Sequence, residues 1–140
     1  MADILIVEPD KNQRLLLEEE LACEGHRVRS AASGRDALAA ASKALPGLVV
    51  LDLHMKGMDG FELLGRLLAI SIRLPVVIYT AYTGYRDNYM ASAADAYLIK
   101  QSDLTELKDT IARLLGEPAP PLPQPAAASP LSWSPGRGMV

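Results

Sequence analysis

Short apolar segments alternate with longer amphipathic segments along the first 116 residues, and this alternation limits the possible folds more than any other feature. Residues 4–7, 48–51 and 76–79 are almost entirely apolar. Segments that are apolar on both faces suit strands of a parallel sheet covered by helices on each side. Two weaker segments of the same kind, residues 27–29 and 96–99, bring the expected number of strands to five.

The segments between and after these strands have helical spacing. The clearest is the last, where Leu104, Leu107 and Ile111 are spaced i, i+3 and i+7, and Gly116 can end the helix. We also expect helices near Leu17 and Leu21, Ala37, Leu38 and Ala41, and Phe61, Leu64 and Leu68. Residues 83–92 are polar, and we expect a further helix there. Strand and helix then alternate five times, which predicts an α/β fold with an open parallel sheet.

The composition changes sharply after Gly116. Residues 117–140 hold seven of the ten prolines and have no apolar periodicity. We therefore expect one domain over residues 1–116 and a disordered Pro/Ala-rich tail over residues 117–140. The Pro-x-x-Pro spacing of the tail could bind a grooved partner, but a solvated tail is the simpler interpretation.

Charge and cysteine content exclude several classes of protein. The formal net charge is -3, which gives no electrostatic reason to expect nucleic-acid or membrane binding. Cys23 is the only cysteine, so a disulfide framework and a cysteine-rich metal site are excluded. No apolar run approaches the roughly 20 residues of a membrane helix, and Asp3 and Glu8 do not suit a secretory signal. We expect a cytoplasmic protein.

Polar side chains stand where the predicted strands end. Glu8 and Asp10 follow the first strand, while Asp52, Thr80 and Lys100 end the third, fourth and fifth. Ligands of open parallel sheets bind at this edge. Each residue alone has an ordinary interpretation, such as a helix cap for Asp10. Together, the carboxylates favour Mg²⁺, and the hydroxyl and ammonium could hold an anion, which indicates phosphoryl transfer.

The same residues resemble the receiver domains of two-component response regulators. Residues 51–60, Leu-Asp-Leu-His-Met-Lys-Gly-Met-Asp-Gly, look like the phosphoacceptor loop of that family. Thr80-Ala81 and residues 97–100 fall where the family has its hydroxyl, aromatic switch and lysine. The resemblance covers residues 3–116. It implies a flavodoxin-like, doubly wound, five-stranded parallel sheet with strand order 2-1-3-4-5 and helices on both faces, as in CheY-like single-domain receivers.

The resemblance also implies a phosphoacceptor and a metal site. Asp52 would be the residue that is phosphorylated. Glu8, Asp10 and Asp52, with the backbone carbonyl of His54, would bind Mg²⁺.

It further implies a switch and a partner surface. Thr80 and Lys100 would contact the phosphoryl oxygens, and Tyr97 would turn inward when Thr80 moves.

Tyr82, Tyr85 and Tyr89 share one face if residues 82–90 are helical, and we expect that face to bind partners. His54 and Tyr82 would overhang the acceptor and influence loss of the phosphoryl group. The alternatives are that the tyrosines pack over the fourth strand and that His54 and Tyr82 are ordinary loop residues without a kinetic role.

Three positions depart from the family pattern. Pro9 stands in place of the second acidic residue, so we expect weaker Mg²⁺ binding; Asp10 either compensates or only caps a helix. Gln101 follows Lys100 where proline is usual, so we expect a trans peptide bond and an altered direction for the lysine. Lys56 replaces a common proline in the acceptor loop.

The predicted function is a stand-alone receiver that accepts a phosphoryl group from a histidine kinase or phosphotransfer protein and signals to a downstream target protein. We do not expect an enzyme. A phosphorylation-independent pseudo-receiver is the main alternative. An aspartate-nucleophile phosphatase would need a second acid where His54 stands, and the acidic turn over residues 8–10 does not suit a flavin phosphate.

Overall fold

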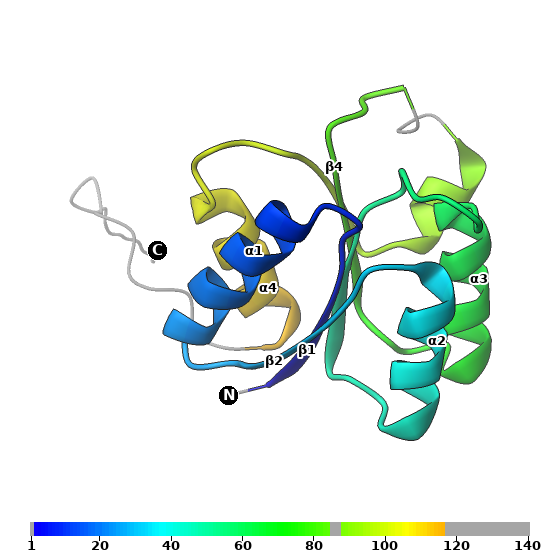
Figure 1. Ribbon diagram of the computed structural model, residues 1–140, viewed down its shortest axis with the longest axis horizontal. Coiled ribbons are helices and arrows are strands. Elements are labelled where there is room, and N and C mark those ends of the chain that lie inside the picture. The colour runs from blue at the N-terminus through cyan, green and yellow to red at the C-terminus, as the bar shows by residue number, and fades with distance from the viewer. Residues whose placement is uncertain (1, 85–87, 117–140) are drawn as a thin grey trace, which may run out of the picture.

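The computed structural model describes residues 2–84 and 88–116 (Figure 1). Its elements follow in the order β1 (Asp3–Val7), α1 (Lys11–Cys23), β2 (Arg27–Ala31), α2 (Gly34–Lys43), β3 (Leu48–Leu51), α3 (Gly60–Ile70), β4 (Val76–Thr80), the 3-10 helix η1 (Tyr89–Ala93), β5 (Ala96–Ile99) and α4 (Thr105–Leu114). The five strands form one parallel sheet with the order β2-β1-β3-β4-β5. The predicted flavodoxin-like, doubly wound α/β fold is confirmed.

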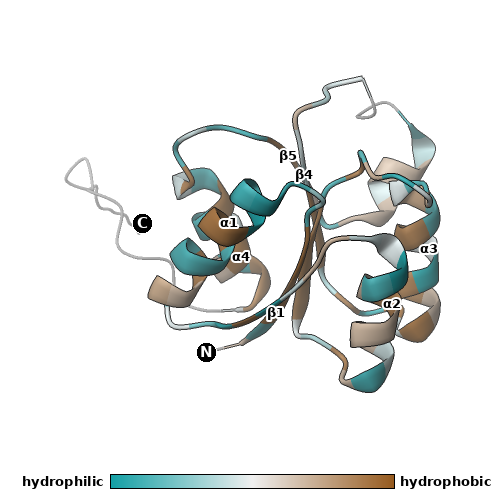
Figure 2. Cartoon of the chain, viewed as in Figure 1, coloured by the Kyte–Doolittle hydropathy of each residue, from teal (hydrophilic) through white to brown (hydrophobic). Residues whose placement is uncertain are grey.

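Helices cover both faces of the sheet. Helices α1 and α4 lie on one face, and α2, α3 and η1 lie on the other (Figure 1). Successive side chains of a strand point to opposite faces. Ile4 and Ile6 of β1 therefore pack beneath α1 and α4, whereas Leu5 and Val7 pack beneath α2 and α3. This double coverage explains why the strands are apolar on both faces. In Figure 2 the strands at the centre of the molecule have the colour of hydrophobic residues.

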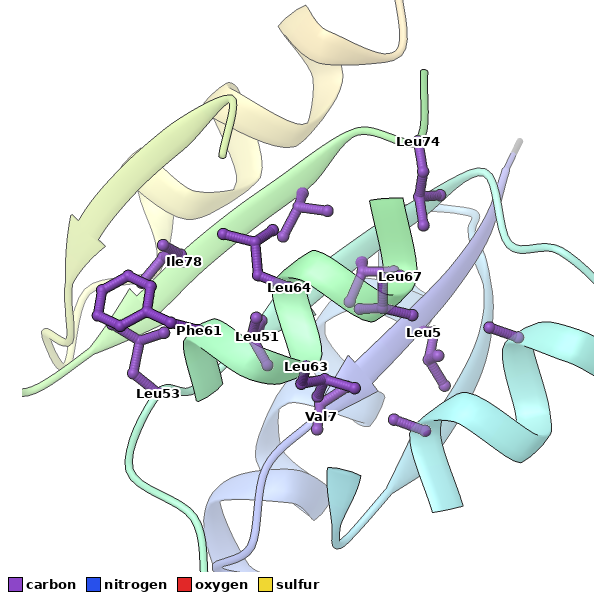
Figure 3. Close-up of a cluster of buried hydrophobic side chains, with 14 of the residues drawn as sticks. Leu5, Val7, Leu51, Leu53, Phe61, Leu63, Leu64, Leu67, Leu74 and Ile78 are labelled. Carbon is purple, nitrogen blue, oxygen red and sulfur yellow. The ribbon is translucent and has the colours of Figure 1, made fainter. Parts of the chain in front are cut away.

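Of the predicted apolar face of α3, Phe61 and Leu64 are buried in the larger of the two hydrophobic clusters, while Leu68 is only partly buried against it. Leu67 is buried in its place. Phe61, Leu64 and Leu67 extend from this helix toward the sheet, in the same cluster as Leu51 and Ile78 (Figure 3). The packing holds α3 and the loop before it against the carboxyl end of β3. The acceptor loop thus begins and ends on rigid elements.

The predicted helix over residues 83–92 is wrong for the part of this segment that the structure describes. Residues 81–84 are not helical, and only the short 3-10 helix η1 follows Asn88. The segment has no apolar stripe that could hold a longer helix on the sheet, and in η1 only Ala91 is buried. None of the described helices is long and apolar enough to cross a membrane.

Gly60 allows the acceptor loop to lie close to the start of α3. A Cβ atom at this position would lie 2.5 Å from Leu53 Cα and 2.8 Å from the Leu53 carbonyl oxygen. Asp59 caps the helix, because its Oδ1 accepts the amide of Phe61 at 2.7 Å. The Asp-Gly pair thus sets both the start of α3 and the path of the loop that carries Asp52.

We expect Gly60→Ala to destabilise the protein by about 2 kcal/mol or more, because the new methyl group would meet backbone atoms that cannot move independently. Gly65→Ala is the matched control on the same helix, since its nearest neighbour, Met90 Cε, is 4.0 Å away. That control should be neutral or stabilising by up to about 1 kcal/mol. Urea unfolding of both variants measures the difference; equal stabilities would contradict the close approach.

Candidate functional site

Two buried carboxylates meet at the carboxyl ends of the central strands. Glu8 directly follows β1 and Asp52 directly follows β3, and both side chains are almost completely buried. Val7 pairs with Leu51 in the sheet, which places the next residue of each strand side by side. The amide of Asp52 donates to the Val7 carbonyl at 3.0 Å, so the main chain fixes this neighbourhood. From β1 the chain first adds β2 on one side and then β3 on the other, so the strand order switches here. Ligands of open parallel sheets bind at such a switch point.

The Lys100 ammonium group joins the two carboxylates. Its Nζ lies 2.7 Å from Glu8 Oε1 and 2.8 Å from Asp52 Oδ2, and it also donates to Gln13 Oε1 at 2.5 Å. The lysine side chain is only 16% exposed, so solvent screens these ion pairs less than it would on an open surface. The structure thus places the Lys100 ammonium beside Asp52, with Gln101 and not proline as the next residue.

The pKa values of Glu8 and Lys100 are both raised, for different physical reasons. Burial raises the pKa of Glu8 above its ordinary value, despite the opposing hydrogen bond from Lys100, and the Asp52 charge adds to the increase. Burial alone would lower the pKa of Lys100. Its hydrogen bonds to Asp52 and Glu8 outweigh that effect, so the pKa of Lys100 is raised.

Asp10 does not join the cluster. Its Oδ1 accepts the amides of Asn12 at 2.9 Å and Gln13 at 3.2 Å, which caps α1. Pro9 contributes no side-chain oxygen at the intervening position. Within residues 2–84 and 88–116, no three acidic, histidine or cysteine side chains form a group that could hold a metal ion. The structure gathers Glu8 and Asp52 and leaves Asp10 outside.

Thr80 and Tyr97 both bind the backbone of Tyr82. The buried Thr80 hydroxyl accepts the Tyr82 amide at 3.4 Å, and the Tyr97 hydroxyl donates to the Tyr82 carbonyl at 2.5 Å. The Tyr82 ring lies against the His54 ring, with centroids 5.1 Å apart. The His54 amide in turn donates to Asp52 Oδ1 at 3.0 Å. The predicted switch residues and the predicted overhanging residues are therefore in one connected set.

The predicted tyrosine face is only partly described. Tyr82 and Tyr89 are exposed, by 48% and 83%. Tyr85 lies outside the described residues. Tyr82 precedes η1 and is not helical, so the helical spacing on which the shared face depended is absent from the described residues. Two of the three tyrosines are therefore exposed as a partner surface would require, but Tyr82 and Tyr89 do not lie on one helix.

Two residues of the site had no signal in the sequence. Gln13 contacts Lys100 from α1, and the Tyr79 hydroxyl contacts both main-chain groups of Gln101. A glutamine in a first helical turn and a tyrosine at the end of an apolar strand are ordinary residues in a sequence. Only the fold gives them these contacts, because the Lys100 side chain reaches the start of α1 and β4 pairs directly with β5. The Lys100–Gln101 bond is trans, as expected, since the described residues contain no cis peptide.

The family model of the response regulator receiver domain matches residues 4–112. The chain belongs to this family. Among curated relatives, this receiver is 37% identical over 115 residues to sporulation initiation phosphotransferase F of Bacillus subtilis, covering 80% of this chain and 92% of that protein. It is 38% identical over 102 residues to the transcriptional regulatory protein AfsQ1 of Streptomyces coelicolor, covering 71% of this chain but only 45% of AfsQ1.

Solved structures give the same result. The response regulator protein TrrA of Thermotoga maritima, in complex with Mg²⁺-BeF, has 35% identity and a TM-score of 0.79, covering 81% of this receiver and 99% of TrrA. TrrA in complex with the histidine kinase ThkA has 36% identity and a TM-score of 0.77, covering 82% of this receiver and 99% of TrrA. Receivers of this kind belong to two-component and phosphorelay signalling.

The raised pKa of Glu8 predicts how stability depends on pH when divalent cations are removed by a chelator. The folded receiver holds the Glu8 proton more tightly than the unfolded chain, so the free energy of unfolding falls as pH rises through the interval between the ordinary and the raised pKa. Glu8→Gln lacks this contribution. Its melting temperature relative to wild type should therefore rise with pH across that interval. A difference that stays constant or falls with pH would contradict the raised pKa.

Proposed function

We propose that this receiver accepts a phosphoryl group on Asp52 from a histidine kinase or phosphotransfer protein and signals through protein contacts. The observation that carries the proposal is the Lys100 ammonium 2.8 Å from Asp52 Oδ2, at the carboxyl edge of the sheet. An acceptor carboxylate needs a cation that can offset the charge of an incoming phosphoryl group, and Lys100 supplies one.

The carboxylate of Asp52 acts as the nucleophile. One of its oxygens forms a bond to phosphorus while the phosphorus–nitrogen bond of the donor phosphohistidine breaks, and the imidazole leaves with the electron pair and takes up a proton. Oδ1 accepts one hydrogen bond from the His54 amide and Oδ2 one from Lys100, so each oxygen keeps free lone pairs. The product is an acyl phosphate.

The charges of the site suit a divalent cation. Two buried carboxylates face one ammonium group, which leaves a net negative charge in a poorly solvated place. Mg²⁺ is commonly held by one or two carboxylates and several waters. Glu8 and Asp52, with the His54 carbonyl, would hold it, while Asp10 Oδ1 caps α1. When bound, Mg²⁺ would neutralise charge on the transferred group.

Output depends on the contacts of Tyr82. If the Thr80 hydroxyl turns toward a phosphoryl oxygen, its bond to the Tyr82 amide is lost. Tyr97 holds the carbonyl of the same residue, so the loop and the aromatic ring shift together. The exposed Tyr82 and Tyr89 then present a changed surface to a target protein.

The comparisons support the choice of partner. A relative of this chain forms a complex with a histidine kinase, and another bears the name of a phosphotransferase. In this role the chain carries a signal in the cytoplasm and is not an enzyme with a substrate of its own. Its net charge of -3 favours protein contacts over nucleic acid.

One observation favours the alternative, a pseudo-receiver that binds partners without phosphorylation. The described residues contain no group of three metal-binding side chains, because Pro9 replaces an acid and Asp10 caps α1. Such a protein would keep the fold and its interaction surface and lose the chemistry.

Intact-mass spectrometry after incubation with Mg²⁺ and a small phosphodonor distinguishes the two. We expect one phosphoryl adduct on the wild type and none on Asp52→Asn, which keeps the size of the side chain but removes its nucleophilic charge. A wild type without an adduct, both with the small donor and with a phosphorylated histidine phosphotransfer protein, would refute the proposal and favour the pseudo-receiver.

We expect Pro9→Asp to tighten Mg²⁺ binding about tenfold, because it adds a carboxylate next to Glu8. Asn12→Asp adds the same charge at an exposed position of α1 and serves as the control, with little change expected. Isothermal titration of both variants with Mg²⁺ measures the effect. Equal affinities for wild type and Pro9→Asp would show that the metal does not bind beside residue 9.

A further inference from the structure

The segment after β5 must hold its direction if Lys100 is to reach Asp52. The main chain leaves the sheet at this point, since β5 ends at Ile99 and residues 100–101 have no regular structure. The Lys100 amide still donates to the Thr80 carbonyl at 2.8 Å. This bond fixes the main chain on the N-terminal side of the Lys100 Cα atom. A second contact is needed to fix it on the C-terminal side.

Tyr79 provides that second contact. Its hydroxyl donates to the Gln101 carbonyl at 3.1 Å and accepts the Gln101 amide at 3.3 Å. A phenolic hydroxyl can donate and accept at the same time. The ring is only 6% exposed and packs in the cluster beneath α1 and α4, so the hydroxyl is held by a rigid side chain. Two neighbouring residues of β4 therefore hold the chain on both sides of Lys100.

One of these two hydrogen bonds depends on Gln101 not being proline. Proline has no amide hydrogen and could not donate to Tyr79. The other contact of Gln101, from its Nε2 to Glu106 Oε1 at 3.2 Å, is exposed and contributes little. The buried anchor for this residue is Tyr79.

We propose that Tyr79 is a positioning residue, whose hydroxyl fixes the main chain of Gln101 and thereby directs the Lys100 ammonium at Asp52. The role of Lys100 in phosphorylation rests on the proposed function; the positioning itself does not. The restraint that proline usually supplies in this family is here supplied by a side chain of the neighbouring strand.

Tyr79→Phe is a suitable variant because it keeps the buried ring. A cavity of about 340 Å³ adjoins Tyr79, Gln101 and Leu16, so water can reach the groups that lose the hydroxyl. The variant should therefore fold. Thr110→Val, which removes a buried hydroxyl from α4, is the control for a general loss of stability.

The test is a double-mutant cycle on the full chain, with the phosphorylation rate measured by intact mass with a small phosphodonor. We expect Tyr79→Phe to slow phosphorylation about three- to tenfold, with unchanged Mg²⁺ affinity, and Thr110→Val to have no such effect. In a Lys100→Ala background, Tyr79→Phe should cause no further loss, because it acts through Lys100. An equal loss in both backgrounds, or none in either, would overturn the proposal.

A second measurement needs no phosphorylation. In nuclear magnetic resonance spectra, Tyr79→Phe should speed hydrogen exchange of the Gln101 amide about tenfold and average the two Lys100 ε-methylene proton signals. Unchanged exchange and unchanged signals would overturn the positioning role. If the wild type is not phosphorylated but these spectral changes occur, the proposed function is wrong and the role of Tyr79 stands.

Discussion

The site depends on the ion pairs of the Lys100 ammonium group with Glu8 and Asp52. The ammonium group joins carboxylates that lie 92 and 48 positions away in the sequence, and each lies on a different strand end. Without it, Glu8 and Asp52 would be two like charges in a buried place, which is costly. With it, the site still carries a net negative charge, because two carboxylates face one ammonium group. This remaining charge makes the site receptive to a cation. Burial, with a smaller contribution from the Asp52 charge, raises the pKa of Glu8.

The sheet makes this contact possible and links it to the surface. Parallel strands bring Glu8, Asp52 and Lys100 to one edge, and β4 lies between the acceptor and the lysine strand. Thr80 and Tyr79, adjacent on β4, hold different partners: Thr80 binds the Tyr82 loop and Tyr79 binds the segment after Lys100. A charge added at Asp52 would thus act on both segments through a single strand. This is the physical basis for a switch in the proposed function.

Sequence patterns predicted a parallel α/β sheet with polar residues at the strand ends, and the family resemblance added the strand order; the failures have physical causes. Strands that are buried on both faces are readable because their central residues are apolar on both faces. The segment over residues 83–92 was misread because a short 3-10 helix depends on tertiary contacts and not on periodicity. Asp10 had two possible roles in the sequence, and the structure shows the helix cap. The contact of Tyr79 with Gln101 joins residues 22 apart through strand packing, which no local pattern encodes.

A crystal structure of the full chain with Mg²⁺ and beryllofluoride tests the central claim most directly. The account predicts beryllofluoride on Asp52, with the Lys100 ammonium moved from Glu8 to a fluorine and the Thr80 hydroxyl turned away from the Tyr82 amide. Mg²⁺ should contact Glu8 and Asp52 while Asp10 still caps α1. An empty Asp52, with Lys100 still joining both carboxylates at saturating ligand, would contradict the account.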